Sequence, residues 1–186
     1  MPEPAPAYSI DRGRIRLADV VFVYLERMPA PPGPLPPDVV PRAYGVAPTS
    51  ESPSGGVVAG VGPGEAVWLG FQPVDSAQPA IVRIRVDAPE PLDAFTGEPW
   101  QDGLSDDPRN HLVCPPDYRL TGVRQADGYL PFGLGDVDRQ LSVLSYGDAP
   151  ALVPVELVTL ERFTSLTGIA AEPLDPDSAY KGWRLP

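Results

Sequence analysis

A short segment of strict alternation most constrains the fold of this chain. Val82, Ile84 and Val86 fall on one face of an extended strand, and the two intervening residues, Arg83 and Arg85, fall on the other. A repeat of two residues is typical of a strand with one buried and one solvated face. We therefore expect a β-strand here, with the two arginines exposed to water.

A second strand is predicted directly before it, over residues 65–71, where apolar and aromatic residues predominate. The connection over 72–79 is rich in residues that form turns. The two strands are therefore expected to form an antiparallel pair, with Trp68 and Val82 both facing the core.

Three glycines at positions 60, 62 and 64 resemble a phosphate-binding loop. Such a loop must open a helix, whose N-terminal amides hold the phosphate. Because the residues that follow have the pattern of a strand, the glycines predict a turn or a bulge and no nucleotide site.

The chain contains 27 prolines, nine of them between residues 29 and 53. Proline is excluded from helix interiors and from central strands, so this content favours short strands joined by ordered loops. The fold class predicted is all-β, an antiparallel β-sandwich of jelly-roll type. The expected division is a flexible arm over 1–13, one sandwich domain over 14–172 with a proline-rich loop at 29–53, and a docked C-terminal tail over 173–186.

The proline-rich loop has two interpretations, a polyproline-type linker or an extended segment laid over the sheet. Residues 14–26 are rich in β-branched and aromatic side chains and are expected to form a strand. Residues 152–166 fit either a helix or a strand, and we favour the strand because the chain before them is β. Further strands are expected at 111–114, 119–124, 129–132 and 139–146.

The formal charge of −11 disfavours nonspecific binding to nucleic acid or to an anionic membrane. No apolar run approaches the 18 residues of a membrane span, and Cys114 alone cannot form an internal disulfide. The N-terminus lacks the basic and apolar regions of a signal peptide. A cytoplasmic location is therefore expected by default, and export without a leader stays open.

Five motifs resemble those of a set of uncharacterised microbial β-rich proteins without known activity. The matching segments here are Gly64–Leu69, the alternating strand 81–86, Thr96–Trp100, Asn110–Pro115 and, imperfectly, Pro131–Gly135. The chain departs from the pattern after Pro115, where Tyr118-Arg-Leu-Thr-Gly122 replaces a Trp-Leu-Asp-Gly segment. The resemblance implies a shared β fold and assigns no catalytic residue.

The densest group of reactive side chains lies between residues 102 and 117. His111 is the only histidine, and beside a carboxylate such as Asp107 or Asp117 it is a candidate general base. Cys114 follows three residues later. Positions 111 and 114 of a strand point to opposite faces, so Cys114 is expected to be a small buried residue and no Cys–His pair is expected.

The same loop offers hard oxygen ligands for calcium, with Asp102, Asp106, Asp107 and Asn110 as candidates. Their spacing matches no EF-hand, and acidic loops on an acidic protein are commonly only solvated. With a single histidine and a single cysteine, zinc ligands are too few. No cofactor is therefore expected, and calcium is the alternative.

Aromatic side chains outside the predicted core are candidates for a groove that binds a sugar or a peptide. The expected ligand-binding residues are Trp100, Tyr118, Arg119 and Tyr129. These features favour a non-catalytic binding or assembly module whose loops contact a protein or a small ligand. A protein partner or self-association through an unpaired sheet edge is expected. The alternative is a small hydrolase, lyase or isomerase that uses the 102–117 loop.

Overall fold

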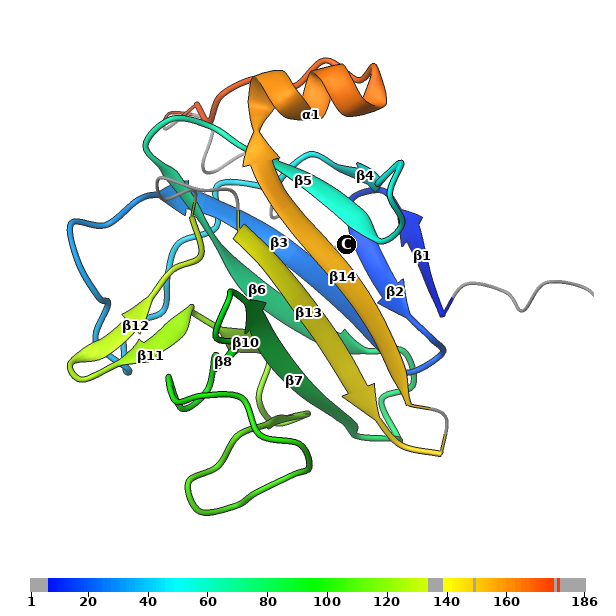
Figure 1. The fold of residues 1–186 in the computed structure, drawn as a ribbon, viewed down its shortest axis with the longest axis vertical. Coiled ribbons are helices and arrows are strands. Elements are labelled where there is room, and N and C mark those ends of the chain that lie inside the picture. Colours follow the sequence, from blue (N-terminus) through cyan, green and yellow to red (C-terminus); the bar gives the residue numbers. More distant parts are fainter. Residues whose placement is uncertain (1–6, 134–138, 149, 176, 178–186) are drawn as a thin grey trace, which may run out of the picture.

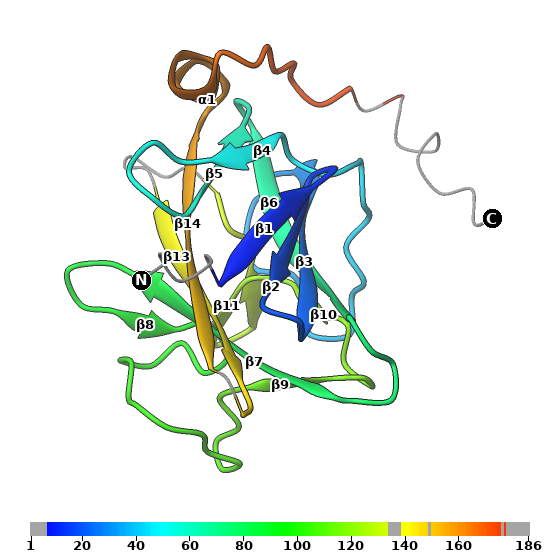
Figure 2. The ribbon, with the colours of Figure 1, turned by 90° about the vertical axis from the view of Figure 1, so that its right-hand side faces the viewer.

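Two β-sheets pack face to face, and the all-β sandwich predicted from the sequence is confirmed (Figures 1 and 2). The computed structural model describes residues 7–133, 139–148, 150–175 and 177. One helix of eight residues, α1 (Leu160–Thr167), lies at one end of the sandwich. Within the described residues, no helix is long and apolar enough to cross a membrane.

The first sheet has five antiparallel strands in the order β1-β2-β3-β6-β10. Its strands are β1 (Tyr8–Asp11), β2 (Arg14–Leu17), β3 (Val21–Pro29), β6 (Glu65–Pro73) and β10 (Arg119–Leu120).

The second sheet has seven strands, with the order β4-β5-β14-β13-β7-β8 and β9 also pairing with β7. All its pairings are antiparallel except that of β5 with β14. Its strands are β4 (Thr49–Glu51), β5 (Val57–Val61), β7 (Ala80–Asp87), β8 (Leu92–Asp93), β9 (Leu112–Cys114), β13 (Arg139–Tyr146) and β14 (Ala151–Thr159); a separate hairpin joins β11 (Val123–Gln125) to β12 (Gly128–Leu130).

The core lies between the two sheets, and period-2 alternation directs side chains into it. Val82, Ile84 and Val86 of β7 are at most 6% exposed, as the alternation predicts. From the first sheet, Val23 and Leu25 of β3 belong to the same core cluster and are fully buried. Burial of one such aliphatic side chain is worth roughly 1.5–3 kcal/mol.

The predicted pairing of the 65–71 strand with the 81–86 strand is wrong. Strand β6 pairs with β3, whereas β7 pairs with β13 in the opposite sheet. Adjacent strands form a hairpin most readily when a tight turn joins them. Here the longer connection between β6 and β7 carries the chain from one sheet to the other (Figure 2).

The N-terminal expectations also need correction. The single strand predicted over 14–26 is two antiparallel strands, β2 and β3, because the chain turns at Ala18, which has a positive φ of 48°. The flexible arm predicted over 1–13 is wrong for residues 8–11, while residues 1–6 lie outside the described residues. Its residues 8–11 form β1, which pairs with β2 and thereby satisfies its backbone hydrogen bonds.

The ambiguous segment 152–166 contains both predicted elements. It is strand β14 up to Thr159 and helix α1 beyond it. The Thr159 hydroxyl accepts a hydrogen bond from the amide of Arg162 at 3.2 Å, and Gly168 ends the helix with φ 72°. Gly60 of β5 lies under the helix, where a Cβ atom would come within 3.0–3.1 Å of Leu160 and Phe163.

The proline-rich loop is laid over the outer face of the five-stranded sheet, which was one of its two interpretations. Leu35 exchanges backbone hydrogen bonds with Tyr129, and the Arg27 amide donates to the carbonyl of Gly45 at 2.8 Å. The Trp68 indole donates to the carbonyl of Arg42 at 3.4 Å. The backbone hydrogen bonds fix residues 44–47 along the edge of β3, and the contact with Trp68 places the segment around Arg42 over the outer face of the sheet.

Segment 172–174 lies against the first sheet through one buried ion pair. Arg27 donates to both carboxylate oxygens of Glu65, at 2.8 and 3.1 Å, and the Glu65 carboxylate also accepts from the amides of Gly62 and Leu174. Burial by itself raises the pKa of Glu65, but these hydrogen bonds and the charge of Arg27 outweigh it and lower the pKa. The rest of the predicted tail, 178–186, lies outside the described residues.

Candidate functional site

Arg83, which was expected to be solvated, is buried at 1% exposure. Its guanidinium pairs with Asp93 at 2.5 Å, and the side chains of both residues are at most 3% exposed. It also donates to the carbonyls of Gln101 and Gly103. The loop that follows β8 covers this face of β7, so alternation there no longer separates buried from solvated side chains.

The Thr96–Trp100 motif is part of the same structural unit. One Asp93 carboxylate oxygen accepts hydrogen bonds from the amides of Phe95 and Thr96. The Trp100 ring stacks on the Arg83 guanidinium, whose central carbon lies 3.7 Å from the ring centroid. The most distinctive motif of the chain therefore holds the buried Arg83 in place, and Trp100 is engaged in this stack.

A surface cleft of about 400 Å³ brings together several residues that the sequence singled out. His111, Asp117, Tyr118, Arg119 and Tyr129 all line it. We call it the His111 cleft; its other lining residues are Pro37, Phe95, Arg109, Leu112, Pro116, Leu120 and Thr121. Three of the four expected ligand-binding residues are thus found together, while Trp100 does not line this cleft.

The acids of the 102–117 loop do not converge on His111. Asp106 approaches the His111 imidazole at 3.7 Å, but its own side chain is almost fully exposed. Asp117 pairs with Arg109 at 3.4 Å across the exposed surface. Asp107 is exposed and does not line the cleft. A catalytic role for Asp107 or Asp117 therefore stays a prediction.

Two of the candidate calcium ligands, Asn110 and Asp102, are instead hydrogen-bonded to other groups of the protein. Asn110 is buried, and its side chain binds the amide of Ser105 and the carbonyl of Gly103, at 2.9 and 3.1 Å. Asp102 accepts a hydrogen bond from the Trp100 indole. Among the described residues, no group of three or more His, Cys, Asp or Glu side chains is arranged to hold a metal ion.

Cys114 lies in the core with no exposed surface, whereas His111 lines a surface cleft. Burial, with a smaller contribution from the charge of Asp117, raises the pKa of the Cys114 thiol to about 11. At neutral pH the sulfur is therefore protonated and unreactive. The predicted role of Cys114 as a small buried residue is confirmed.

A second hollow, of about 640 Å³, lies on the outer face of the five-stranded sheet. We call it the Glu26 groove; its lining residues are Tyr24, Glu26, Val40, Trp68, Gly70, Phe71, Gln72, Tyr118 and Arg119. Tyr118 and Arg119 line both this groove and the His111 cleft.

Strand register explains why the groove exists. Gly70 of β6 is opposite Tyr24 of β3 on one side and Arg119 of β10 on the other. Because glycine has no side chain, the row between the tyrosine and the arginine is left open. Glu26 and Trp68 form the next cross-strand pair along the same face.

Trp68 was expected in the core, and its position in the groove corrects that prediction. In β6 the side chains of Val67 and Leu69 point into the core and are at most 1% exposed. Trp68 lies between them, so its side chain points to the opposite, outer face of the sheet. The ring is half-buried under the proline-rich loop.

Glu26 and Glu65 are both buried, but their environments differ. The side chain of Glu26 makes no hydrogen bond or ion pair with any described residue, and burial raises its pKa. Glu65 is fully paired and its pKa is lowered. These opposite shifts give opposite dependences of stability on pH.

We expect Glu26→Gln to increase the free energy of unfolding at pH 7–8, because the folded wild type must hold an unpaired buried carboxylate there. The folded state binds more protons at this site than the unfolded state, so the benefit disappears as pH falls below the ordinary value of 4.5. Glu65→Gln should instead lower stability at neutral pH, by about 3 kcal/mol, and this loss should fade in acid. Urea unfolding across pH measures both, and a Glu26→Gln variant that is less stable at pH 7 would contradict the account.

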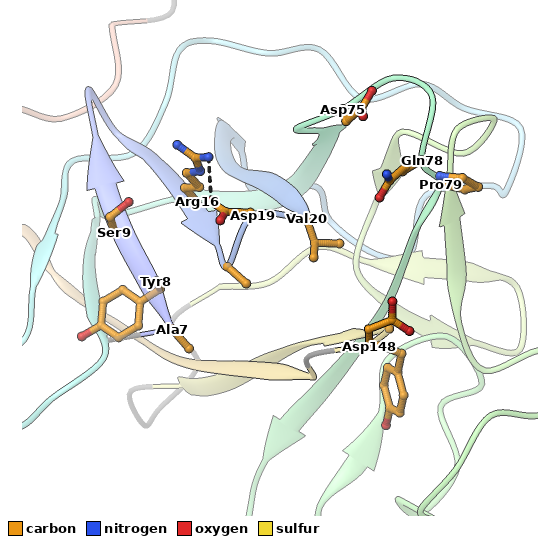
Figure 3. A pocket seen from close by; sticks show the side chains of 13 residues that line it. Ala7, Tyr8, Ser9, Arg16, Asp19, Val20, Asp75, Gln78, Pro79 and Asp148 are labelled. Atoms are coloured by element: carbon orange, nitrogen blue, oxygen red, sulfur yellow. Dashed lines mark hydrogen bonds and ion pairs between the residues drawn. The ribbon is translucent and has the colours of Figure 1, made fainter. Parts of the chain in front are cut away.

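A third hollow, of about 680 Å³, is lined by residues of β1 and β2, of the β6–β7 connection and of the end of β13 (Figure 3). Arg16 there is paired with Asp19 at 2.7 Å, and the Tyr8 hydroxyl is bound to the backbone of Gly56. Asp75 and Gln78, on the connection between β6 and β7, are exposed to solvent. The buried Nε of Arg16, by contrast, has no hydrogen-bond partner among the described residues.

Comparison with family models, with curated proteins and with solved structures finds no match to this chain. The likeness to microbial β-rich proteins therefore stays a prediction. The function of the His111 cleft and the Glu26 groove must therefore be inferred from the residues that line them.

Proposed function

We propose that this protein is a non-catalytic binding module that holds a ligand on the outer face of its five-stranded sheet. The observation that carries the proposal is the position of Tyr118 and Arg119, which line both the His111 cleft and the Glu26 groove. Tyr118 is 55% exposed, so a large aromatic surface is available for contact. Exposed aromatic and arginine side chains are frequent anchors in binding sites.

The surroundings of this surface are suited to binding. The groove is lined by aromatic side chains with a few polar groups, which is the usual composition of a ligand pocket. It is built on paired strands and roofed by a loop that is hydrogen-bonded to the sheet. A surface held in this way loses little conformational entropy when it binds.

Tyr118→Ser tests the proposal. A fragment library is screened by thermal shift against the wild type, and the hits are then measured on the variant. We expect hits that occupy the shared surface to bind at least tenfold more weakly to Tyr118→Ser, because a central aromatic contact is lost. Since Tyr118 is exposed, the variant itself should stay within about 0.5 kcal/mol of wild-type stability.

Leu152→Ser is the matched control, because Leu152 is 41% exposed on β14 in the other sheet. Its affinity for the same hits should equal that of the wild type. Hits that bind all three proteins equally would place binding elsewhere and refute the proposal.

The alternative is an enzyme whose base is His111, in a cleft that Asp117 also lines. His111→Ala separates the two. A binding module should hold its hits unchanged in chemical form, and the His111→Ala variant should fold with a similar affinity for hits in the Glu26 groove. Turnover of a hit by the wild type that disappears in His111→Ala would favour the enzyme.

A further inference from the structure

Glu26 is a largely buried acid whose carboxylate has no hydrogen-bond or ion-pair partner among the described residues, although its oxygens keep some contact with solvent. Val23 and Leu25 of β3 point into the core, so Tyr24 and Glu26 point outward into the groove. The residue is nevertheless only 5% exposed, because Trp68 and Val40 line the groove with it and Val46 of the proline-rich loop pairs with it along the edge of β3. No described residue donates a hydrogen bond to it or forms an ion pair with it.

Neither Arg27, next to Glu26 in the sequence, nor Arg119, along the groove, neutralises the negative charge of the Glu26 carboxylate. Arg27, the next residue, points to the other face of the sheet and is fully engaged by Glu65 and the carbonyl of Glu172. Arg119 lines the groove but is exposed at its rim, where solvent and salt screen its charge. A buried carboxylate without a partner is costly, and a cation placed beside it removes that cost.

The walls around Glu26 favour the same kind of partner. Trp68 is its cross-strand neighbour, and Tyr24 and Tyr118 line the same groove. The faces of aromatic rings attract cations, and this attraction strengthens where water is excluded. The volume of about 640 Å³ is within the range of small-molecule sites.

We propose that the Glu26 groove binds an ammonium group carried on an apolar stem, with the ammonium on the Glu26 carboxylate and the stem against Trp68, Tyr24 and Tyr118. The inference rests on the proposed function and specifies its ligand. Two sources carry this chemistry, a free amine and a lysine side chain of a partner. The negative charge of the whole protein, −11, favours the approach of either.

Three matched probes test the proposal by isothermal titration. Phenethylammonium carries the cation, 2-phenylethanol is its neutral counterpart, and 3-phenylpropanoate is an anion of similar shape. We expect the ammonium to bind at least tenfold more tightly than the alcohol, and the anion to bind most weakly. Nα-acetyl-lysine methylamide, which keeps a free ε-ammonium group, represents the lysine side chain of a partner. Tighter binding of this probe than of phenethylammonium would indicate a lysine side chain, and weaker binding would indicate a free amine.

Glu26→Gln keeps the shape of the side chain and removes its charge. In this variant the ammonium should lose at least tenfold in affinity, whereas the alcohol should bind as it does to the wild type. Gly70→Val fills the open row of the groove and should weaken all of the probes. Circular dichroism establishes that both variants are folded.

Each outcome is decisive. If the alcohol binds as tightly as the ammonium, and Glu26→Gln changes neither, the ammonium assignment is overturned while the groove remains a binding site. If no probe binds the wild type, the ammonium assignment also fails. The proposed function is then judged separately by the fragment hits and their dependence on Tyr118.

Discussion

Replacement of Asp93 by alanine should lower the free energy of unfolding by about 3–5 kcal/mol, because it leaves the buried Arg83 guanidinium without its counter-charge. The change also removes the acceptor for the amides of Phe95 and Thr96. For a domain of this size the loss corresponds to roughly 10 °C in Tm. Urea unfolding at neutral pH measures it.

Asp102→Ala is the matched control, since Asp102 is an exposed acid in the same loop and contacts the Trp100 indole. We expect this control to change stability by less than about 1 kcal/mol. Asp93→Asn, which keeps an acceptor oxygen for the amides but removes the charge, should fall between the two. If Asp93→Ala were no more harmful than Asp102→Ala, the buried pair would not be the element that holds the loop.

Gly97→Ala should be destabilising by roughly 3 kcal/mol or more. Gly97 has φ 76°, a conformation that costs an alanine about 1–2 kcal/mol. In addition, a Cβ atom would lie 2.4 Å from the carbonyl oxygen of Arg124 at the start of the β11–β12 hairpin. Neither backbone segment can move without breaking the hydrogen bonds that fix it, so the overlap adds strain.

Gly103 separates these two effects. It has a similar φ of 86°, but no atom lies within 4 Å of a Cβ placed there. Gly103→Ala should therefore carry only the conformational cost, and the difference between the two variants isolates the contact with Arg124. Equal losses in thermal or urea unfolding would show that the contact is relieved without cost.

The sequence predicted the sandwich because alternation is a local property. Val82, Ile84 and Val86 face the core as expected, since their pattern depends only on strand geometry. The same pattern failed for Arg83, because the neighbouring strand β8 supplies Asp93 and the loop after β8 folds over the outer face of β7. Strand pairing and the coverage of a sheet depend on contacts between separate segments of the chain, and the alternation within one strand does not predict these contacts.

The candidate site was predicted only in part, for the same reason. Tyr118, Arg119 and Tyr129 were selected as candidates for a ligand-binding groove outside the predicted core, and they do share a cleft. Trp68 was assigned to the core, although its place between Val67 and Leu69 puts it on the opposite face. Glu26 shares the outward phase of Tyr24, but its burial comes from the proline-rich loop and could not be inferred from position alone.

The most direct test of the ligand site uses the three tryptophan indole signals in a ¹H–¹⁵N spectrum during titration with phenethylammonium. Trp68 lines the Glu26 groove, whereas Trp100 is stacked on Arg83 and does not. The account predicts that the Trp68 signal moves with saturation and that the Trp100 signal stays in place. A Trp100 signal that moves while that of Trp68 is unchanged would contradict it.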